Sequence, residues 1–424
     1  MRLVLVNPHT FAYGKSMSAF IFRKRMFMKY DFFIQFYIKN RRRDVAFFID
    51  GARTSFGIAI PFLAKSAASI ELLFWMIING INPFRVRVYS DINKLDPRND
   101  VLFDFSRSLV DVDEKTAPRL RLNRFQGVVF IHFTHYFKGI TKLAEYIKTI
   151  PHCIIAAESD LASNNFFRKF FPSIQETYQL PYSFSERFVL QKEYNNRINK
   201  CLAVGTMCMV KEKEFVGFFG AERTLHPMRK VIFDRHQELT GEIDSLIKGF
   251  DDVMRLRQSN DTDSLSLKFL KKFLPYIILE KFISSRQKDY FKFDIVKQFN
   301  NYRMFICPEE LVGLPSVNAF EGMACKCAYV GIEDPMYTNL GLIPGIHYIT
   351  YKRDDMEDLL LKIRYYQTHP EELERIAENG YNFVRKNFNR ENIANLLWND
   401  MEAISKNFFE HRKASLHCSF KRKF

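Results

Sequence analysis

The sequence predicts an α/β protein with two parallel-sheet domains. The chain has 424 residues, which is more than a single hydrophobic core usually supports. Hydrophobic residues make up 47% of it and charged residues 26%, so the chain can fill sizeable cores and is not disordered. Short apolar segments alternate with helix-like segments, which is the pattern of parallel sheets with crossover helices.

The first half contains six strand-like segments. Each is short, rich in apolar or β-branched residues, and followed by a turn or a polar break. They are residues 2–7, 44–50, 84–90, 101–106, 127–133 and 153–159. Residues 68–80 and 140–150 lie between them and have helical patterns. We expect one parallel sheet in this half.

The alternation stops at a proline-containing stretch, residues 179–188, and a new strand at 199–206 ends in Gly-Thr. We place the domain boundary there and expect an amino-terminal domain, a carboxy-terminal domain, and a terminal helix with a basic tail. Their expected ranges are 1–185, 186–395 and 396–424. A helix capped by Thr224 should follow the new strand.

Residues 56–78 form the most apolar stretch, but Pro61, Lys65 and Glu71 interrupt it. We expect a buried helix there and not a membrane span. The start, MRLVLVNPH, resembles a first strand more than a signal peptide. The seven cysteines lack the paired spacing of a zinc site, so reduced thiols are expected. The expected location is cytoplasmic.

The net charge of +15 indicates an anionic partner. Residues 20–43 carry eight Lys or Arg, eight aromatic residues and one acid, and residues 411–424 are basic without any acid. Three interpretations remain open: a solvated helix with a core face, an anionic membrane surface at the inner face of the cytoplasmic membrane, and single-stranded nucleic acid. We expect no nucleic-acid partner.

The stretch GLPSVNAFEGMACKCAYVG, residues 313–331, suggests a ligand site. A strand, a turn at Gly313 and a helix beginning near Ser316 present backbone N–H groups and the positive end of a helix dipole to a phosphate. Ser316 is expected to cap the helix. Glu321, further along, could accept hydrogen bonds from the two hydroxyls of a ribose.

Residues 294–404 resemble the donor-binding half of group 1 glycosyltransferases, which have the GT-B fold. That family carries a first Glu, a Gly-rich turn, a second Glu and Ala-Met-Ala-Cys-Gly. Here Glu310, the turn at 313–315, Glu321 and Met-Ala-Cys at 323–325 follow in the same order, with Lys326 in the Gly position. The later His-Pro-Glu-Glu helix, residues 369–372, is similar too.

This resemblance implies two Rossmann-like domains that face a central cleft, with residues 1–185 on the acceptor side and residues 186–395 binding the nucleotide-sugar donor. It also implies a UDP- or GDP-linked sugar as co-substrate without another cofactor. It implies a donor site formed by Gly205, Thr206, Gly313, Leu314, Pro315, Ser316, Val317 and Glu321. It also implies that Glu310 contacts the donor sugar, and that His132 or His135 does so from the end of an amino-terminal strand.

The family neutralises the departing diphosphate with basic residues after its first donor-domain strand, and Thr206 stands in the Arg position here. Lys211, Lys213, Arg223 and Arg229 are the alternatives. Because fixed N–H dipoles and a basic side chain can stabilise the leaving group, we expect no metal site. The two Asp-x-Asp pairs, 111–113 and 261–263, are a pattern that arises often by chance.

The resemblance therefore predicts a hexosyltransferase-type glycosyltransferase. The expected acceptor is a glycan or a lipid-linked glycan in surface polysaccharide or glycolipid biosynthesis, and transfer is expected to retain the anomeric configuration. The alternative is a non-catalytic nucleotide-sugar-binding protein on the same fold.

Overall fold

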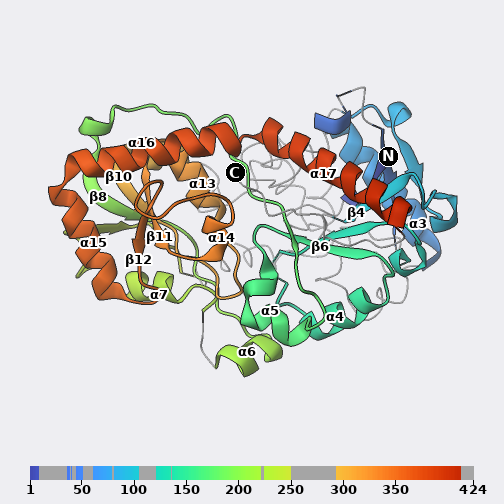
Figure 1. Cartoon of the computed structure of the whole chain (residues 1–424), viewed down its shortest axis with the longest axis horizontal. Helices are drawn as coiled ribbons and strands as arrows, with labels where there is room; N and C mark the ends of the chain where they lie inside the picture. The colour runs from blue at the N-terminus through green and yellow to red at the C-terminus, as the bar shows by residue number, and fades with distance from the viewer. Residues whose placement is uncertain are drawn as a thin grey trace, which may run out of the picture.

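A computed structural model describes ten segments of the chain. They are residues 1–8, 36–38, 40, 44–50, 61–78, 81–104, 121–134, 136–220, 224–249 and 293–411. Two parallel sheets form the centres of two α/β halves, which lie side by side (Figure 1).

The first sheet has seven strands in the order β3-β2-β1-β4-β5-β6-β7, and all its pairings are parallel. The strands are β1 (Arg2–Val6), β2 (Val45–Phe48), β3 (Arg87–Tyr89), β4 (Asp100–Asp104), β5 (Val129–His132), β6 (Cys153–Ala157) and β7 (Tyr178–Gln179). All six expected strands are confirmed. Strand β7 was not predicted, because two residues are too few for an alternating pattern.

The described helices of the first half are α3 (Pro61–Ile78), α4 (Ile140–Lys148) and α5 (Asn165–Phe170). The prediction of a helix within residues 56–78 is confirmed, but the prediction that it is buried is wrong in part. Its Ile70, Leu73 and Ile77 side chains are exposed. Within the described chain, no helix is both long and apolar enough to cross a membrane.

The second sheet has five parallel strands in the order β12-β11-β10-β8-β9. They are β8 (Ile198–Ala203), β9 (Ile243–Ser245), β10 (Tyr302–Ile306), β11 (Ala328–Ile332) and β12 (Ile349–Tyr351). The expected strand at 199–206 is therefore confirmed, and β10 is the strand expected before the turn at Gly313.

The helices of the second half are α6 (Lys213–Phe219), α7 (Pro227–Asp234), α12 (Ile295–Asn301), α13 (Val317–Met323), α14 (Pro335–Thr338), α15 (Met356–Thr368) and α16 (Pro370–Asn387). The expected cap at Thr224 is wrong: α7 begins at Pro227 after His226, and proline suits a first helical position because its missing N–H would be unpaired there. Ser316 does precede α13, but its side chain makes no capping hydrogen bond.

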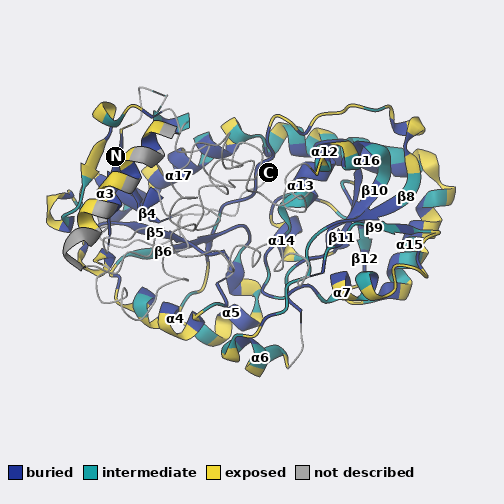
Figure 2. Cartoon of the chain, turned by 180° about the vertical axis from the view of Figure 1, so that it is seen from behind, coloured by how far each residue is buried: buried dark blue, intermediate teal, exposed yellow. Residues whose placement is uncertain are grey.

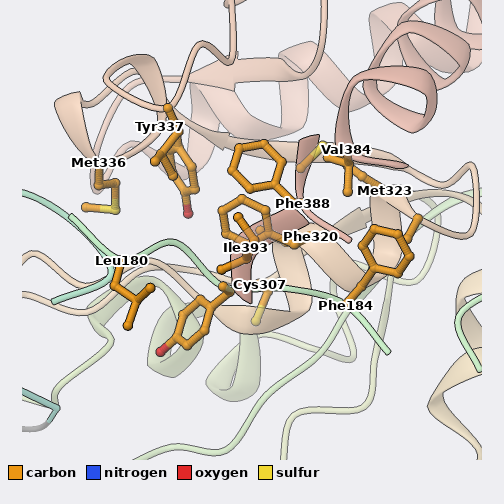
Figure 3. Close-up of a cluster of buried hydrophobic side chains, with 14 of the residues drawn as sticks. Leu180, Phe184, Cys307, Phe320, Met323, Met336, Tyr337, Val384, Phe388 and Ile393 are labelled. Carbon is orange, nitrogen blue, oxygen red and sulfur yellow. The ribbon is translucent and has the colours of Figure 1, made fainter. Parts of the chain in front are cut away.

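The last helix, α17 (Arg390–His411), returns to the first half (Figure 1). The Tyr37 hydroxyl donates to the Ala394 carbonyl at 2.6 Å, and the Tyr178 hydroxyl donates to Asp400 at 2.7 Å. One apolar core joins the two halves: Leu180 and Phe184 lie near Phe320, Phe388 and Ile393 (Figure 3).

Most of residues 20–43, and residues 412–424 of the basic tail, lie outside the described residues.

Candidate functional site

The strand orders locate the crevice where each sheet can bind a ligand. In an open parallel sheet, ligands bind beyond the carboxyl ends of the strands at the point where the strand order reverses. In the second sheet that point lies between β8 and β10, because β9 flanks β8 on one side and β10 flanks it on the other. The loops after Ala203 and Ile306 therefore form this crevice.

Arg229 reaches the crevice from the first turns of α7. Its Nη1 donates to the Thr206 carbonyl at 3.0 Å, and its Nη2 donates to Cys307 Sγ at 3.5 Å. A Cβ on Gly205 would lie 2.8 Å from the guanidinium carbon, and Gly205 has a φ of +136°. Glycine at 205 thus lets the guanidinium lie directly against the backbone after β8.

Arg229 is a buried cation, with 7% of its surface exposed. Within the described part of the chain it forms no ion pair, and its Nε has no hydrogen-bond partner. A buried charge is unfavourable unless an opposite charge accompanies it. The guanidinium is therefore suited to an anion that arrives from solution.

Cys307 connects this cation to the turn before α13. Its sulfur lies 2.8 Å from Ser316 Oγ, and Asn318 Nδ2 donates to it at 3.6 Å. The structure thereby brings Gly205 and Thr206 together with Ser316, as an anion site at the strand ends would require. Cys307 and Asn318 were not predicted as site residues, because a cysteine after a strand resembles an ordinary core residue.

The structure also distinguishes the four basic residues that were candidates for the contact with the diphosphate. Lys211 and Lys213 are exposed, and Arg223 lies outside the described residues. Among the three candidates that the structure describes, Arg229 alone is buried at the ends of β8 and β10.

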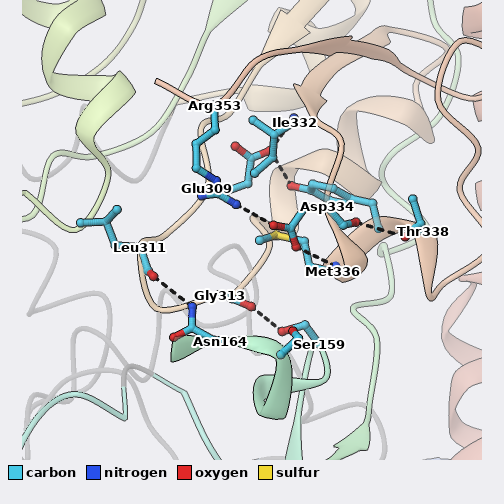
Figure 4. Close-up of polar contacts among 12 residues, drawn as sticks. Ser159, Asn164, Glu309, Leu311, Gly313, Ile332, Asp334, Met336, Thr338 and Arg353 are labelled. Carbon is cyan, nitrogen blue, oxygen red and sulfur yellow. Dashed lines mark hydrogen bonds and ion pairs between the residues drawn. The ribbon is translucent and has the colours of Figure 1, made fainter. Parts of the chain in front are cut away.

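The amino-terminal half binds the turn at 311–313 through three successive carbonyls. Figure 4 shows the bonds to Leu311 and Gly313. Asn164 Nδ2 donates to Leu311 O at 3.1 Å, and the Tyr136 hydroxyl donates to Val312 O at 2.9 Å. The Ser159 hydroxyl donates to Gly313 O. The turn next to the crevice is therefore also a contact between the two halves.

The side chains of this turn continue the same contact. Val312 and Leu314 are buried in the hydrophobic cluster of the amino-terminal half. Pro315 is also buried, and Val317 is partly buried. Val312 and Leu314 therefore hold the turn against the opposite half.

Glu310 precedes the turn and faces the start of α7, where its Oε1 lies 3.6 Å from His226 Nε2. The charges of Glu310 and Arg229 both act on the Cys208 thiol: burial and Glu310 raise its pKa, whereas Arg229 lowers it. Glu310 and the buried cation are therefore in one neighbourhood, although they belong to different loops.

The neighbouring acid, Glu309, has a different environment. Its Oε1 accepts from the Tyr329 hydroxyl at 2.7 Å and from the Tyr337 hydroxyl at 2.9 Å. Burial raises the pKa of Glu309, and the two tyrosine hydrogen bonds act against that rise. A small pocket lies beside it, lined also by Met228, Leu311, Ile332, Tyr351 and Arg353.

In the amino-terminal half, His132 ends β5 and is buried, with its Nε2 3.6 Å from Glu158 Oε1 after β6. His135 lies outside the described residues. Asn7 connects the ends of β1 and β2. Its Nδ2 donates to Asp50 O at 3.0 Å, and its Oδ1 accepts from Asp50 N at 2.9 Å. These polar side chains line the carboxyl edge of the first sheet.

Glu321 lies within α13 and is completely covered by protein. Lys326 has a φ of +58°, a left-handed conformation that glycine adopts without strain. The Lys326 ammonium pairs with Glu378 at 2.6 Å and Glu374 at 3.1 Å. Lys326 therefore has a backbone conformation that suits glycine, and its side chain forms ion pairs with α16.

No group of three or more potential metal-ligating side chains occurs among the residues that the structure describes. Both Asp-x-Asp pairs lie in segments outside that set. The six described cysteines form no disulfides.

Comparisons with known proteins support the fold. A protein-family model described as Glycosyl transferase-like matches residues 284–399. No curated protein sequence matches the chain. Anabaena HepE, solved in complex with UDP and glucose, is similar in structure with a TM-score of 0.50 and 10% identity, over 95% of this chain and 100% of that chain.

Two further solved structures score slightly lower. A glycosyltransferase from Rickettsia africae has a TM-score of 0.49 and 12% identity, over 96% of this chain and 99% of that one. A sucrose-phosphate synthase from Thermosynechococcus elongatus has a TM-score of 0.46 and 10% identity, over 97% and 99%. The resemblance to GT-B glycosyltransferases and the predicted fold of two parallel-sheet domains are confirmed.

Proposed function

Because the chain has the GT-B fold and its residues 284–399 match a glycosyltransferase family, we propose that it transfers a sugar from a nucleotide-sugar donor. The donor is UDP- or GDP-linked. The acceptor is a glycan or a lipid-linked glycan in surface polysaccharide or glycolipid biosynthesis. Anabaena HepE was solved with UDP and glucose, which supports this donor class.

One observation carries the proposal: the buried Arg229 guanidinium, without an acidic partner among the described side chains, lies at the reversal point of the second sheet. A nucleoside diphosphate supplies the missing negative charge. Arginine suits this ligand because its planar guanidinium binds phosphate oxygens through more than one N–H. Arg229 thereby compensates for Thr206, which stands where the family has an arginine.

In the proposed reaction the bond between the anomeric carbon and the phosphate oxygen breaks, and the acceptor oxygen bonds to that carbon. Arg229 and the backbone N–H groups at 314–317 stabilise the charge that develops on the diphosphate. The acceptor proton passes to the departing diphosphate. Glu310 and a histidine from the opposite half, His132 or His135, orient the sugar, and Glu321 binds the ribose.

We further propose that transfer retains the anomeric configuration and requires no metal. Closure of the two halves around the donor would exclude water, so that the sugar reaches the acceptor instead of being hydrolysed. Arg229 carries the charge that a divalent ion carries in metal-dependent designs.

Isothermal calorimetry with UDP and GDP tests the donor site, and incubation with a panel of nucleotide sugars tests transfer. We expect binding to one of the two nucleotides, loss of that binding in Glu321→Ala, and transfer to a lipid-linked or glycan acceptor. Because Glu321 is completely covered by protein, circular dichroism must show that this variant folds. Nucleotide binding with neither transfer nor hydrolysis for any donor would favour the non-catalytic alternative. Absence of nucleotide binding at millimolar concentration would contradict both.

A further inference from the structure

Among the described side chains of helix α3, one apolar set is buried and another is exposed. Its core-facing side chains are buried: Ala68, Leu72 and Met76. A second set of apolar side chains recurs after three and then four residues, so it lies along another side of the helix. These side chains are Ile70, Leu73 and Ile77, and they are 55%, 41% and 55% exposed.

The chain after α3 carries a further exposed apolar side chain. A short 3-10 turn, Pro83–Arg85, contacts α3 and leads into β3, the edge strand of the first sheet. Phe84 at the tip of the turn is 99% exposed. Its backbone N–H donates to the Asn82 side chain at 3.0 Å, which fixes the turn in place. A phenylalanine ring is thus presented to the surroundings by ordered backbone.

Basic side chains border these apolar groups. Among the exposed side chains that the structure describes between residues 65 and 89, the charged ones are Lys65, Arg85 and Arg87. All three are cationic. Isolated exposed apolar residues are ordinary, but a contiguous apolar surface with a charged border is characteristic of an interaction site.

We propose that this surface, which we call the α3 face (Ile70, Leu73, Ile77, Phe84, Arg85 and Arg87), docks the protein on an anionic phospholipid bilayer. The aliphatic side chains and the phenylalanine ring enter the boundary between headgroups and acyl chains, while the arginines contact lipid phosphates. Figure 2 shows α3 at the outer end of the amino-terminal half, with its exposed positions in yellow.

A bilayer fits the α3 face better than a second copy of the chain does. In a twofold dimer the same patch meets itself, so Arg85 and Arg87 of both copies would surround one apolar centre. Like charges in that position repel, and each chain already carries a net charge of +15. Anionic headgroups neutralise the same arginines.

Co-sedimentation of the full-length protein with phosphatidylcholine vesicles, with and without phosphatidylglycerol, tests the proposal. Two variants remove its parts: Ile77→Ser with Phe84→Ser, and Arg85→Glu with Arg87→Glu. The matched control is Leu361→Ser, because Leu361 is 64% exposed on α15 in the other half. Circular dichroism melts confirm that each variant folds.

We expect the wild type and the control to bind vesicles that contain phosphatidylglycerol, and each double variant to bind them about tenfold more weakly. Unchanged binding in both variants would overturn the proposal, as would binding that disappears only when residues 412–424 are removed. A wild-type dimer that Phe84→Ser converts to a monomer, measured by light scattering, would assign the face to self-association instead. Nucleotide binding by calorimetry should be unaffected throughout, which separates this test from that of the proposed function.

Discussion

The side-chain amide of Asn164 fills the space that a side chain on Gly313 would need. A Cβ at residue 313 would lie 2.9 Å from Asn164 Nδ2, closer than real Cβ contacts allow. Gly313 also has a φ of +80°, which other residues adopt only with strain. Since Asn164 belongs to one half of the molecule and Gly313 to the other, glycine at 313 permits both the turn and the contact between the halves.

Gly313→Ala should therefore reduce sugar transfer through a displaced interface. The positive φ alone should lower the free energy of unfolding by about 1–2 kcal/mol. Gly345→Ala is the matched control, because Gly345 has a φ of +71° but a Cβ there would meet no atom within 4 Å. Urea unfolding and steady-state transfer rates measure the two effects. Equal losses of transfer in the two variants would contradict a role for the Asn164 contact.

Gly205→Ala should weaken nucleotide binding without altering any charge. Its new methyl group would meet the Arg229 guanidinium carbon at 2.8 Å, so the cation must leave the ends of β8 and β10. Gly220→Ala is the control, since Gly220 has a φ of +95° and open space around it. We expect at least a tenfold loss of affinity by calorimetry in the first variant only. Similar affinity in both would show that the position of Arg229 does not matter.

The local parts of this structure could be predicted from the sequence, and the parts made by packing could not. Buried parallel strands such as β5 and β6 are recognisable because their apolar runs are local signals. Arg229 could not be ranked above Lys211 or Lys213, because its position depends on how α7 packs against β8. The exposed stripe of α3 was missed because an apolar composition does not reveal which face meets the core.

Glu309→Gln should change the pH dependence of stability. Burial raises the pKa of Glu309 above its ordinary 4.5, so the folded protein keeps this proton at a pH where the unfolded chain has lost it. The contribution of this group to stability therefore decreases as the pH rises from 4.5 through the folded-state pKa. Glutamine cannot ionise but can still accept from Tyr329 and Tyr337. Relative to the wild type, the variant should become more stable as the pH rises over that range.

Chemical unfolding at a series of pH values measures this difference in the free energy of unfolding. The other titrating groups are common to both proteins, so their contributions cancel. A difference that does not vary with pH, or that favours the wild type more at higher pH, would contradict the environment assigned to Glu309.

Lys326→Gly should leave nucleotide binding unchanged, since the lysine side chain pairs with Glu374 and Glu378 on α16. The substitution relieves a left-handed backbone strain of about 1 kcal/mol. It also removes surface ion pairs worth about 0–1 kcal/mol. We expect a net stability change within about 1 kcal/mol. A marked gain in nucleotide affinity would instead indicate that Lys326 impairs the donor site.

The most direct test of the donor site compares Arg229→Met with the wild type, using the nucleoside diphosphate that binds and the matching nucleoside without phosphates. If Arg229 neutralises the diphosphate, the variant should lose at least tenfold in affinity for the diphosphate and keep its affinity for the nucleoside. Arg229→Lys should recover part of the loss, because it restores the charge but not the planar group. Unchanged affinity for the diphosphate, or equal losses for both ligands, would contradict the assignment of Arg229 as the cation of a nucleotide-sugar site.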